Sequence, residues 1–330
     1  MIQHAIFSIP NRRTGYTTDD NARALIAAIM EYERTGSRQV LRVVSTYLSF
    51  LHYAQTPSGH FHNFMSFDQV WLDDQASDDC LGRVLWACGY ALAADLHPNV
   101  KKVAKQLFDR ALRWVPFTRS LRARGYMCMG CYYYLKQEPD SQAVRQVLES
   151  AADLMCELYD FASDDDWRWF EPVMTYSNGI MPRSLFMAHQ ISGSERYLKV
   201  AAESLEFLTS VCVLDDVLYP IGCNGWYMRG EERAFYDQQP VDPMAHTLSY
   251  LAAFDATADA KYLRLAKISF DWFFGRNSVG EWLYDPVTGG CFDALSSEGA
   301  NYNQGSESTI CCLLTQLAML PYIDRLPDEL

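Results

Sequence analysis

Apolar residues recur along the chain at the spacing of α-helices, and the helical segments alternate between two kinds. In the first kind Ala, Gly, Cys and Met occur on all sides, and we expect these helices at Asp19–Glu33, Asp79–Asp95, Arg122–Lys136, Gly179–Ile191, Asp242–Thr257 and Glu307–Leu320. The second kind has one apolar stripe and a charged face, and is expected at Arg38–Ala54, Val100–Val115, Gln142–Phe161, Glu195–Val211 and Ala260–Phe274. Small residues on every side of a helix indicate that it is buried on every side, whereas an amphipathic pattern indicates one solvent-exposed face. The alternation therefore predicts inner and outer layers of helices.

The starts of the inner helices repeat about every 50 to 65 residues, as expected for helical hairpins joined by loops of variable length. The repeats also share a register: Asp79 is followed by Arg83, and Asp242 is followed by His246 at the same offset. No Pro-rich, Gly/Ser-rich or charged linker interrupts the chain. We predict one all-α domain over residues 1–330, with six inner helices, five outer helices and an outer layer that is incomplete.

Three segments resemble a known superfamily: Gly15–Leu25 (GYTTDDNARAL), Tyr176–Leu185 (YSNGIMPRSL) and Asn303–Thr309 (NQGSEST). They are similar to bacterial members of the six-hairpin (α/α)6 toroid glycosidases, some of which are fused to glycosyltransferases. The resemblance covers the whole chain and implies an (α/α)6 toroid that acts on carbohydrate. It leaves the reaction open, because this superfamily includes hydrolases, phosphorylases, lyases and epimerases. It also implies a glycosyltransferase as a possible partner or fused domain.

Carboxylates gather at the starts of the predicted inner helices, which such a ring places on one face. Glycoside cleavage needs one protonated and one ionised carboxyl group, and crowding of carboxylates separates their pKa values. The candidate catalytic residues are Asp19, Asp20, Asp78, Asp79, Glu171, Asp242 and Glu307. The alternative for each Asp is an ordinary N-cap. A cap needs only one side chain, however, so the doubled pairs Asp19-Asp20 and Asp78-Asp79 leave one carboxylate each for function.

Different positions favour different roles for these carboxylates. An Asp at a helix start is stabilised in its charged form by the helix dipole, which suits a general base. Glu171 lies among aromatic residues in Trp167–Pro172, which suits a general acid, although pairing with Arg168 is the alternative. Glu307 is interpreted as a ligand of a sugar hydroxyl or as a charge that complements the dipole of its own helix.

Aromatic and polar residues in the predicted loops are candidates for binding sugar rings. The candidate substrate-binding residues are Tyr16, His60, His62, Trp71, Trp169, Asn178, Trp226, Tyr227, Arg229, Tyr236, Asp237 and His246. Packing in the core or at its rim is the alternative for the rings. For His246, which follows Asp242 by one helical turn, the favoured alternative is a hydrogen-bonded interior histidine.

The net charge of −13 argues against nucleic acid and anionic membranes as partners, because binding phosphate needs a basic surface. The start of the chain lacks the pattern of a signal peptide, and no apolar run reaches the length of a membrane span. The ten cysteines are therefore expected to be reduced thiols in a cytoplasmic protein. Cys128 and Cys131 form a single CxxC pair, which is weak evidence for zinc. We predict no metal and no cofactor, and an oligosaccharide as substrate.

The favoured hypothesis is a glycoside hydrolase that acts on a neutral mannoside- or glucoside-like oligosaccharide with inversion. A second hypothesis is a sugar epimerase or isomerase that uses histidine as acid and base. A third is a non-catalytic carbohydrate-binding module that serves a glycosyltransferase. A phosphorylase is disfavoured because the acidic face offers few cations for phosphate. The sugar, its linkage and the oligomeric state remain open.

Overall fold

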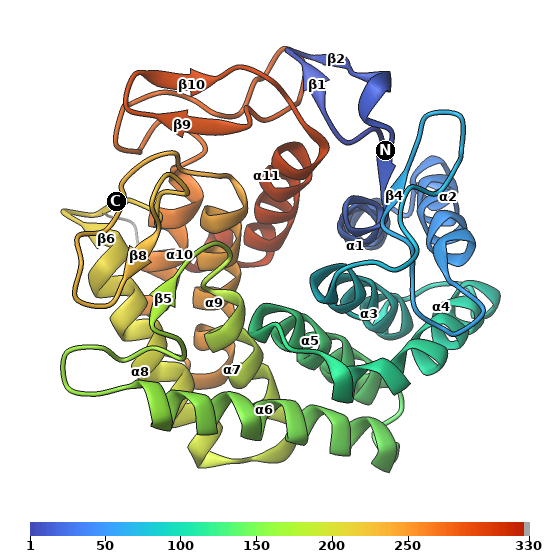
Figure 1. Ribbon diagram of the computed structural model, residues 1–330, viewed down its shortest axis with the longest axis horizontal. Coiled ribbons are helices and arrows are strands. Elements are labelled where there is room, and N and C mark those ends of the chain that lie inside the picture. The colour runs from blue at the N-terminus through green and yellow to red at the C-terminus, as the bar shows by residue number, and fades with distance from the viewer. Residues whose placement is uncertain (327–330) are drawn as a thin grey trace. The chain divides into compact units, whose positions relative to one another are not determined.

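The computed structural model describes residues 1–326, of which the α-helices make up the greatest part (Figure 1). The chain divides into two compact units. The first unit comprises Met1–His4 and Pro10–Ala152, and the second comprises Ala5–Ile9 and Asp153–Leu330. The prediction of a single domain over residues 1–330 stays a prediction, and each unit is described by itself.

The first unit contains three helices that are buried on most sides and two that bury a single stripe. The buried helices are α1 (Thr18–Thr35), α3 (Asp78–Ala93) and α5 (Leu121–Gln137). The amphipathic helices are α2 (Arg38–Ala54) and α4 (Pro98–Ala111), and α4 continues into the 3-10 helix η2 (Leu112–Phe117). In α2, for example, only Val44, Leu48, Leu51 and Ala54 are buried. Helix α3 contacts α1 on one side and α5 on the other, while α2 and α4 pack outside (Figure 1).

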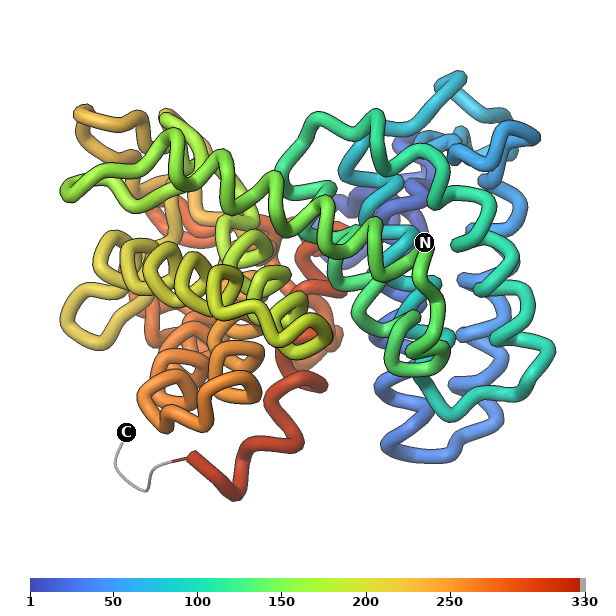
Figure 2. The backbone as a smooth tube through the Cα atoms, turned by 90° about the horizontal axis from the view of Figure 1, so that it is seen from below, coloured from blue at the N-terminus to red at the C-terminus, as the bar shows by residue number. Residues whose placement is uncertain are grey.

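The second unit repeats this arrangement. Its buried helices are α7 (Ile180–Ser192), α9 (Val241–Thr257) and α11 (Ser306–Met319). Its amphipathic helices are α8 (Glu195–Cys212) and α10 (Lys261–Asp271). Helix α9 contacts α7, α10 and α11. Helices α7 and α8 run side by side, as do α9 and α10 (Figure 2). Helix α6 (Gln142–Ala162) contributes its first eleven residues, up to Ala152, to the first unit and the remainder to the second.

All eleven predicted helices are present in the described residues, and their ends differ from the predicted ends by no more than about four residues. After α11 the chain forms the 3-10 helix η3 (Leu320–Arg325), and residues 1–326 contain no sixth outer α-helix. The predicted inner and outer layers are thus confirmed within each unit. Over the described residues, no helix combines the length and the apolar character that crossing a membrane requires.

Glycines let the buried helices approach each other closely. A Cβ atom on Gly89 of α3 would lie 2.1 Å from the carbonyl oxygen of Gly130 on α5, and one on Gly130 would lie 2.5 Å from that of Leu85. In the second unit, a Cβ on Gly179 would lie 2.4 Å from the carbonyl oxygen of Ala245 on α9. Any larger residue at these positions would push two backbones apart, so these contact faces require glycine.

Short strands fix the loops that precede the buried helices. In the first unit β3 (Tyr16–Thr17) pairs antiparallel with β4 (Phe64–Met65), which holds the loop after α2 against the start of α1. In the second unit β5 (Val173–Met174) pairs with β8 (Tyr227–Met228), which joins the loops before α7 and α9. Two-residue strands of this kind supply register but little of the core.

Candidate functional site

The first turn of α1 separates the two predicted carboxylates into different environments. A residue from another part of the chain caps the N-terminus of α1: the Oδ1 atom of Asn63 accepts hydrogen bonds from the backbone N–H groups of Thr18 (3.1 Å) and Asp19 (3.2 Å). Asp20 is buried and accepts hydrogen bonds from the hydroxyl of Thr17 and the guanidinium of Arg23, both at 2.6 Å. Asp20 is therefore half of a buried ion pair that organises the turn, and Asp19 is the carboxylate that keeps contact with solvent.

The first turn of α3 makes the same division. Its cap is Ser77, whose hydroxyl accepts from the N–H of Cys80 at 3.3 Å. The carboxylate of Asp78 accepts from the N–H groups of Arg119 (2.7 Å) and Ser120 (3.2 Å), so it fixes the segment that enters α5. Asp79 accepts from the hydroxyl of Ser120 at 2.7 Å. A structural role thus accounts for Asp78, whereas the catalytic role expected of Asp79 stays a prediction.

Arg83, one turn into α3, connects the two remaining carboxylates. Its guanidinium lies 3.0 Å from Oδ2 of Asp19 and 3.9 Å from Oδ2 of Asp79, and it sits over the ring of Tyr126 at 5.1 Å from the ring centre. We call Asp19, Asp79, Arg83 and Tyr126 the Arg83 cluster. Burial by itself lowers the pKa of Arg83, but Tyr126 and the two carboxylates more than offset it, so the net pKa is raised and the guanidinium stays charged.

The two carboxylates of the Arg83 cluster are mostly buried but remain partly exposed to solvent. The side chain of Asp19 is 17% exposed and that of Asp79 is 11% exposed, whereas that of Asp20 is only 4% exposed. One cation that is shared by two carboxylates fixes their positions, because a guanidinium presents its donors in a rigid fork. A general acid or base must lie within hydrogen-bond reach of the proton it transfers, and partial exposure keeps these two carboxylates within reach of a molecule bound beside them.

The loop before α3 carries three of the predicted sugar-binding residues, His60, His62 and Trp71, and the ring of Trp71 packs against this loop and against α2. His62 stacks on Trp71 with 4.9 Å between ring centres, and its Nδ1 atom donates to the carbonyl oxygen of Asp73 at 2.6 Å. The ring of Tyr16 stacks on Phe67 at 6.2 Å. Trp71 also packs against Phe50 and Tyr53 of α2, and Tyr16 packs against Phe50, so both rings belong to an aromatic cluster. Their role in stacking on a sugar stays a prediction.

His60 is buried, and its Nδ1 atom accepts from the N–H of Phe61 at 2.8 Å. Burial lowers the pKa of His60, which favours the neutral imidazole. Its ring also packs edge-on against Trp114. These contacts are those of a packing residue rather than of a residue that lines an open surface.

In the second unit Asp242 lies in the first turn of α9 and is 1% exposed. One turn later, Nδ1 of His246 donates to the carbonyl oxygen of Asp242 at 2.8 Å, which leaves Nε2 without a proton. This Nε2 atom is buried, and residues 1–326 offer it no hydrogen-bond partner. His246 is 0% exposed, and burial lowers its pKa to about 4. Because the ring is sealed from solvent, this arrangement agrees with the interior histidine that the sequence favoured as the alternative.

The loop before α7 holds two buried candidates and one that is half-buried. Asn178 is buried and closes a turn with Thr175, donating from Nδ2 to its carbonyl oxygen at 2.7 Å. Trp169 is 0% exposed, so the expectation that its ring stacks on a sugar does not fit the structure. The sequence signal misled here because a Trp in a loop can still fold into the core. Glu171 is half-buried, and its carbonyl oxygen accepts from the indole of Trp167 at 2.8 Å.

The loop before α9 and the first turn of α11 contain the other candidates. Trp226, Tyr227, Tyr236, Asp237 and Glu307 are all half-buried. Tyr227 packs edge-on against Trp167, at 5.1 Å between ring centres. These residues keep some contact with solvent, and their predicted roles remain predictions.

Arg229 is exposed, forms an ion pair with Asp164, and donates to the carbonyl oxygen of Ala162 at 2.9 Å. The guanidinium is thus engaged in holding two loops together, a use that sequence reasoning did not anticipate. Sequence reasoning also missed Asn63 and Ser120, whose side chains position the starts of α1 and α5. The only available signal for Ser120 was its place just before a helix, which is typical of N-caps.

The cysteines show no sign of a metal centre. All ten are free thiols, and the CxxC pair, Cys128 and Cys131, is buried within α5. Burial raises the pKa of Cys131 well above its usual value, which opposes the thiolate that a metal would need. Within residues 1–326, no group of three or more His, Cys, Asp or Glu side chains is arranged to hold a metal ion.

No model of a known protein family matches the chain, and no curated protein matches it at a significant level. Solved structures do match it over nearly its whole length. Cellobiose 2-epimerase from Bacillus thermoamylovorans superposes with a TM-score of 0.76 at 11% identity, covering 98% of this chain and 92% of that one. D-mannose isomerase superposes with a TM-score of 0.69 at 13% identity, covering 97% and 92%. The GH76 α-mannanase from Bacteroides thetaiotaomicron superposes with a TM-score of 0.67 at 11% identity, covering 94% and 88%.

The chain has the (α/α)6 toroid fold. The fold class predicted from the alternating helices is therefore confirmed, as is the resemblance in fold to six-hairpin glycosidases. The (α/α)6 toroid serves more than one reaction, because the matching structures are named as epimerases, an isomerase and mannanases. Fold likeness at 11 to 13% identity does not assign any of these activities to this chain.

Proposed function

We propose that this (α/α)6 toroid is a carbohydrate-active enzyme, and specifically a glycoside hydrolase that acts on a neutral mannoside- or glucoside-like oligosaccharide. The observation that carries the proposal is the Arg83 cluster. Two carboxylates from different helices, Asp19 and Asp79, share one guanidinium and keep partial exposure to solvent. Ionised carboxylates of this kind activate water for attack on a glycosidic carbon or stabilise the positive charge that develops there.

Within this proposal, Asp19 and Asp79 are the candidates for the general base. Glu171, Asp242 and Glu307 are the candidates for the general acid. Glu171 is favoured by its aromatic neighbours, and burial counts against Asp242, which is 1% exposed. One of the similar structures is that of an inactive α-1,6-mannanase variant in which two consecutive aspartates are replaced by alanine. The parallel with Asp19-Asp20 and Asp78-Asp79 is one of residue type, and it supports placing the chemistry on paired aspartates. Inversion is the expected stereochemistry.

The test is a screen of the purified chain against mannose- and glucose-based oligosaccharides, with the anomer of the first product followed by NMR. We expect release of a reducing sugar, with activity reduced at least about a thousandfold in Asp19→Asn or Asp79→Asn. The matched control is Asp95→Asn, which removes an exposed carboxylate just after the opposite end of α3 and is expected to keep full activity. Hydrolysis that persists in both cluster variants would refute the assignment. Glycan binding without turnover, unchanged in both variants, would indicate a carbohydrate-binding module instead.

A sugar epimerase or isomerase is the second candidate. Its support is the higher TM-score of the cellobiose 2-epimerase and the neutral, unprotonated Nε2 atom of His246. Against it, His246 is fully buried and has no exposed edge for a sugar. The two candidates differ in their products, since an epimerase changes a stereocentre without releasing a new reducing end. A change of configuration that disappears in His246→Asn would favour the epimerase, and full activity of this variant would exclude it.

A further inference from the structure

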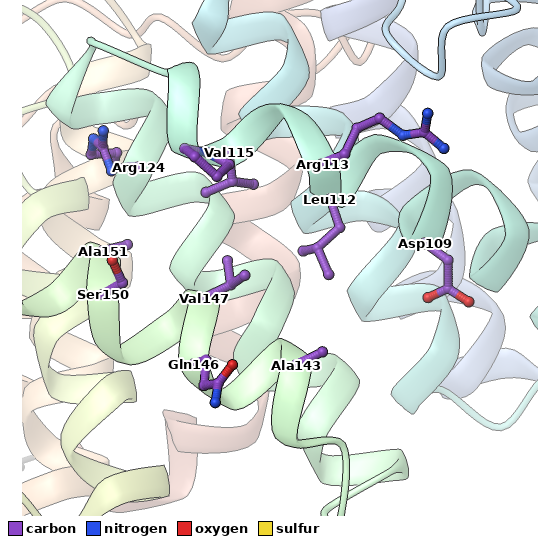
Figure 3. A pocket seen from close by; sticks show the side chains of 11 residues that line it. Asp109, Leu112, Arg113, Val115, Arg124, Ala143, Gln146, Val147, Ser150 and Ala151 are labelled. Carbon is purple, nitrogen blue, oxygen red and sulfur yellow. The ribbon is translucent and has the colours of Figure 1, made fainter.

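A groove on the first unit is lined by no residue of the Arg83 cluster and by no candidate residue of the sequence analysis. It has a volume of about 360 Å³ and is bounded by η2, the start of α5 and the first half of α6 (Figure 3). Its apolar lining comes from Leu112, Val115 and Val147, whose side chains gather in the middle of the groove (Figure 3). A volume of this size suits a small molecule rather than a polymer.

The charged lining of the groove is predominantly basic. Arg113 and Arg124 both line it, and among residues 1–326 neither forms an ion pair. The one carboxylate in the lining, that of Asp109, is already engaged by Lys105 at 2.9 Å. In a chain with a net charge of −13, a groove lined by two guanidinium groups and one engaged carboxylate carries a local surplus of positive charge.

Arg124 has a donor that its surroundings do not satisfy. Its Nη2 atom donates to the carbonyl oxygen of Thr118 at 2.5 Å, which holds the guanidinium in place. Its Nε atom is buried and has no acceptor in the described part of the chain. A buried charged donor without an acceptor is costly, and a guanidinium fork is matched best by a carboxylate or a phosphate.

We propose that this groove binds a small amphiphilic anion. Its carboxylate or phosphate group accepts from Arg124, with Arg113 adding to the positive field, and its hydrocarbon part lies over Leu112, Val115 and Val147. Gln146 and Ser150, at the rim, are positioned for further polar contacts. This binding is independent of the proposed hydrolase activity, because no residue of the groove belongs to the Arg83 cluster.

The test uses the full chain with methyl-labelled Leu and Val and four probes: phenyl phosphate, benzoate, inorganic phosphate and benzyl alcohol. We expect phenyl phosphate or benzoate to bind with shifts at the methyl groups of Leu112, Val115 and Val147. Inorganic phosphate has the anionic group without a hydrocarbon part, and benzyl alcohol has the hydrocarbon part without an anionic group. Each is therefore expected to bind at least about tenfold more weakly. The stronger of the two anions identifies the head group.

Two variants with a matched control make the result specific. Arg124→Ala is expected to weaken binding of the stronger anion at least about tenfold, through the loss of a charge-assisted hydrogen bond. Val147→Trp fills the groove without touching a charge and is expected to weaken it similarly. Arg42→Ala removes an exposed arginine on α2 and is expected to change nothing. The proposal is overturned if neither amphiphilic anion binds, if binding survives both groove variants, or if inorganic phosphate binds as tightly as phenyl phosphate.

Discussion

The guanidinium of Arg83 lies 3.0 Å from the carboxylate of Asp19, although the two residues are separated by 64 positions in sequence. This contact joins the start of α1 to α3, and a second contact joins the same guanidinium to Asp79. Arg83 therefore holds in one place the two carboxylates to which we assign the chemistry.

Replacing Arg83 should affect both stability and activity. Arg83→Ala leaves two sheltered carboxylates without their shared cation, and we expect the free energy of unfolding to fall by about 3 kcal/mol. Arg83→Lys keeps the charge but not the fork, so it should lose less stability while still misplacing the carboxylates. Urea unfolding and glycan turnover measure the two effects. As a control, Arg34→Ala breaks the exposed Glu31–Arg34 pair and should cost under about 1 kcal/mol.

Asp78 and Asp79 are adjacent in sequence, yet their variants should behave differently. Asp78→Ala removes the acceptor of two backbone N–H groups at the entry to α5, so we expect about 2 kcal/mol of destabilisation. Asp78→Asn keeps an acceptor oxygen and should retain most of the stability and the activity. Asp79→Asn should fold normally and lose turnover. If Asp78→Asn proved as inactive as Asp79→Asn, the division of roles within this pair would be wrong.

Asp20 should prove structural, although it was a catalytic candidate by sequence. Its side chain is 4% exposed and pairs with Arg23, which is 1% exposed. Asp20→Ala leaves the buried guanidinium without this carboxylate, and we expect about 3 to 5 kcal/mol of destabilisation. Thermal and urea unfolding measure this loss. A stable Asp20→Ala protein that folds as the wild type does and is inactive would return Asp20 to the catalytic set.

The close approach of α3 and α5 should be intolerant of even one added methyl group. In Gly130→Ala the new Cβ would meet the carbonyl oxygen of Leu85 at 2.5 Å, and backbone atoms cannot rotate out of the way. We expect a loss of at least about 3 kcal/mol. Gly36→Ala, at the C-cap of α1, meets nothing within 4 Å and should cost only about 1 kcal/mol, from its left-handed backbone. Similar losses in the two variants would argue against the tight contact.

Sequence alone predicted the helices well because their signal is local and strong. The two kinds of helix differ along their whole length, so their existence and order did not depend on any single residue. The ends were less certain: α10 stops at Asp271, whereas the apolar pattern runs on to Phe274. Trp272 and Phe273 stay buried although the helix has ended, and periodicity cannot distinguish a buried helix from a buried segment of another shape.

The candidate site was predictable in its residue types but not in its pairings. Asp before a helix is visible in sequence, yet the atom that caps α1 belongs to Asn63, and the carboxylate of Asp78 serves the start of α5 rather than its own helix. Such contacts depend on which loops meet in space. The burial of Trp169 is of the same kind, since whether a loop ring faces solvent depends on tertiary packing.

His246 should make the free energy of unfolding depend on pH, and a comparison with His246→Asn should separate this contribution from those of other groups. Its pKa is lowered to about 4 in the folded protein, whereas an unfolded histidine titrates near 6.5. The unfolded chain therefore takes up a proton that the folded chain refuses as pH falls from about 6.5 to 4. The contribution to stability is fully present above pH 6.5 and decreases below it, by up to about 3 kcal/mol near pH 4. His246→Asn keeps a donor near the position of Nδ1 but cannot titrate.

The measurement is urea unfolding of both proteins at pH 7.5, 6.5, 5.5 and 4.5. Carboxylates lose stability over the same range in both proteins, so only the difference between the two curves reports on His246. We expect this difference to shift in favour of His246→Asn as the pH falls, at up to about 1.4 kcal/mol per pH unit. Parallel curves would mean that the imidazole is solvated in the folded protein. That result would remove the burial argument against its contact with a sugar, and so would strengthen the epimerase alternative.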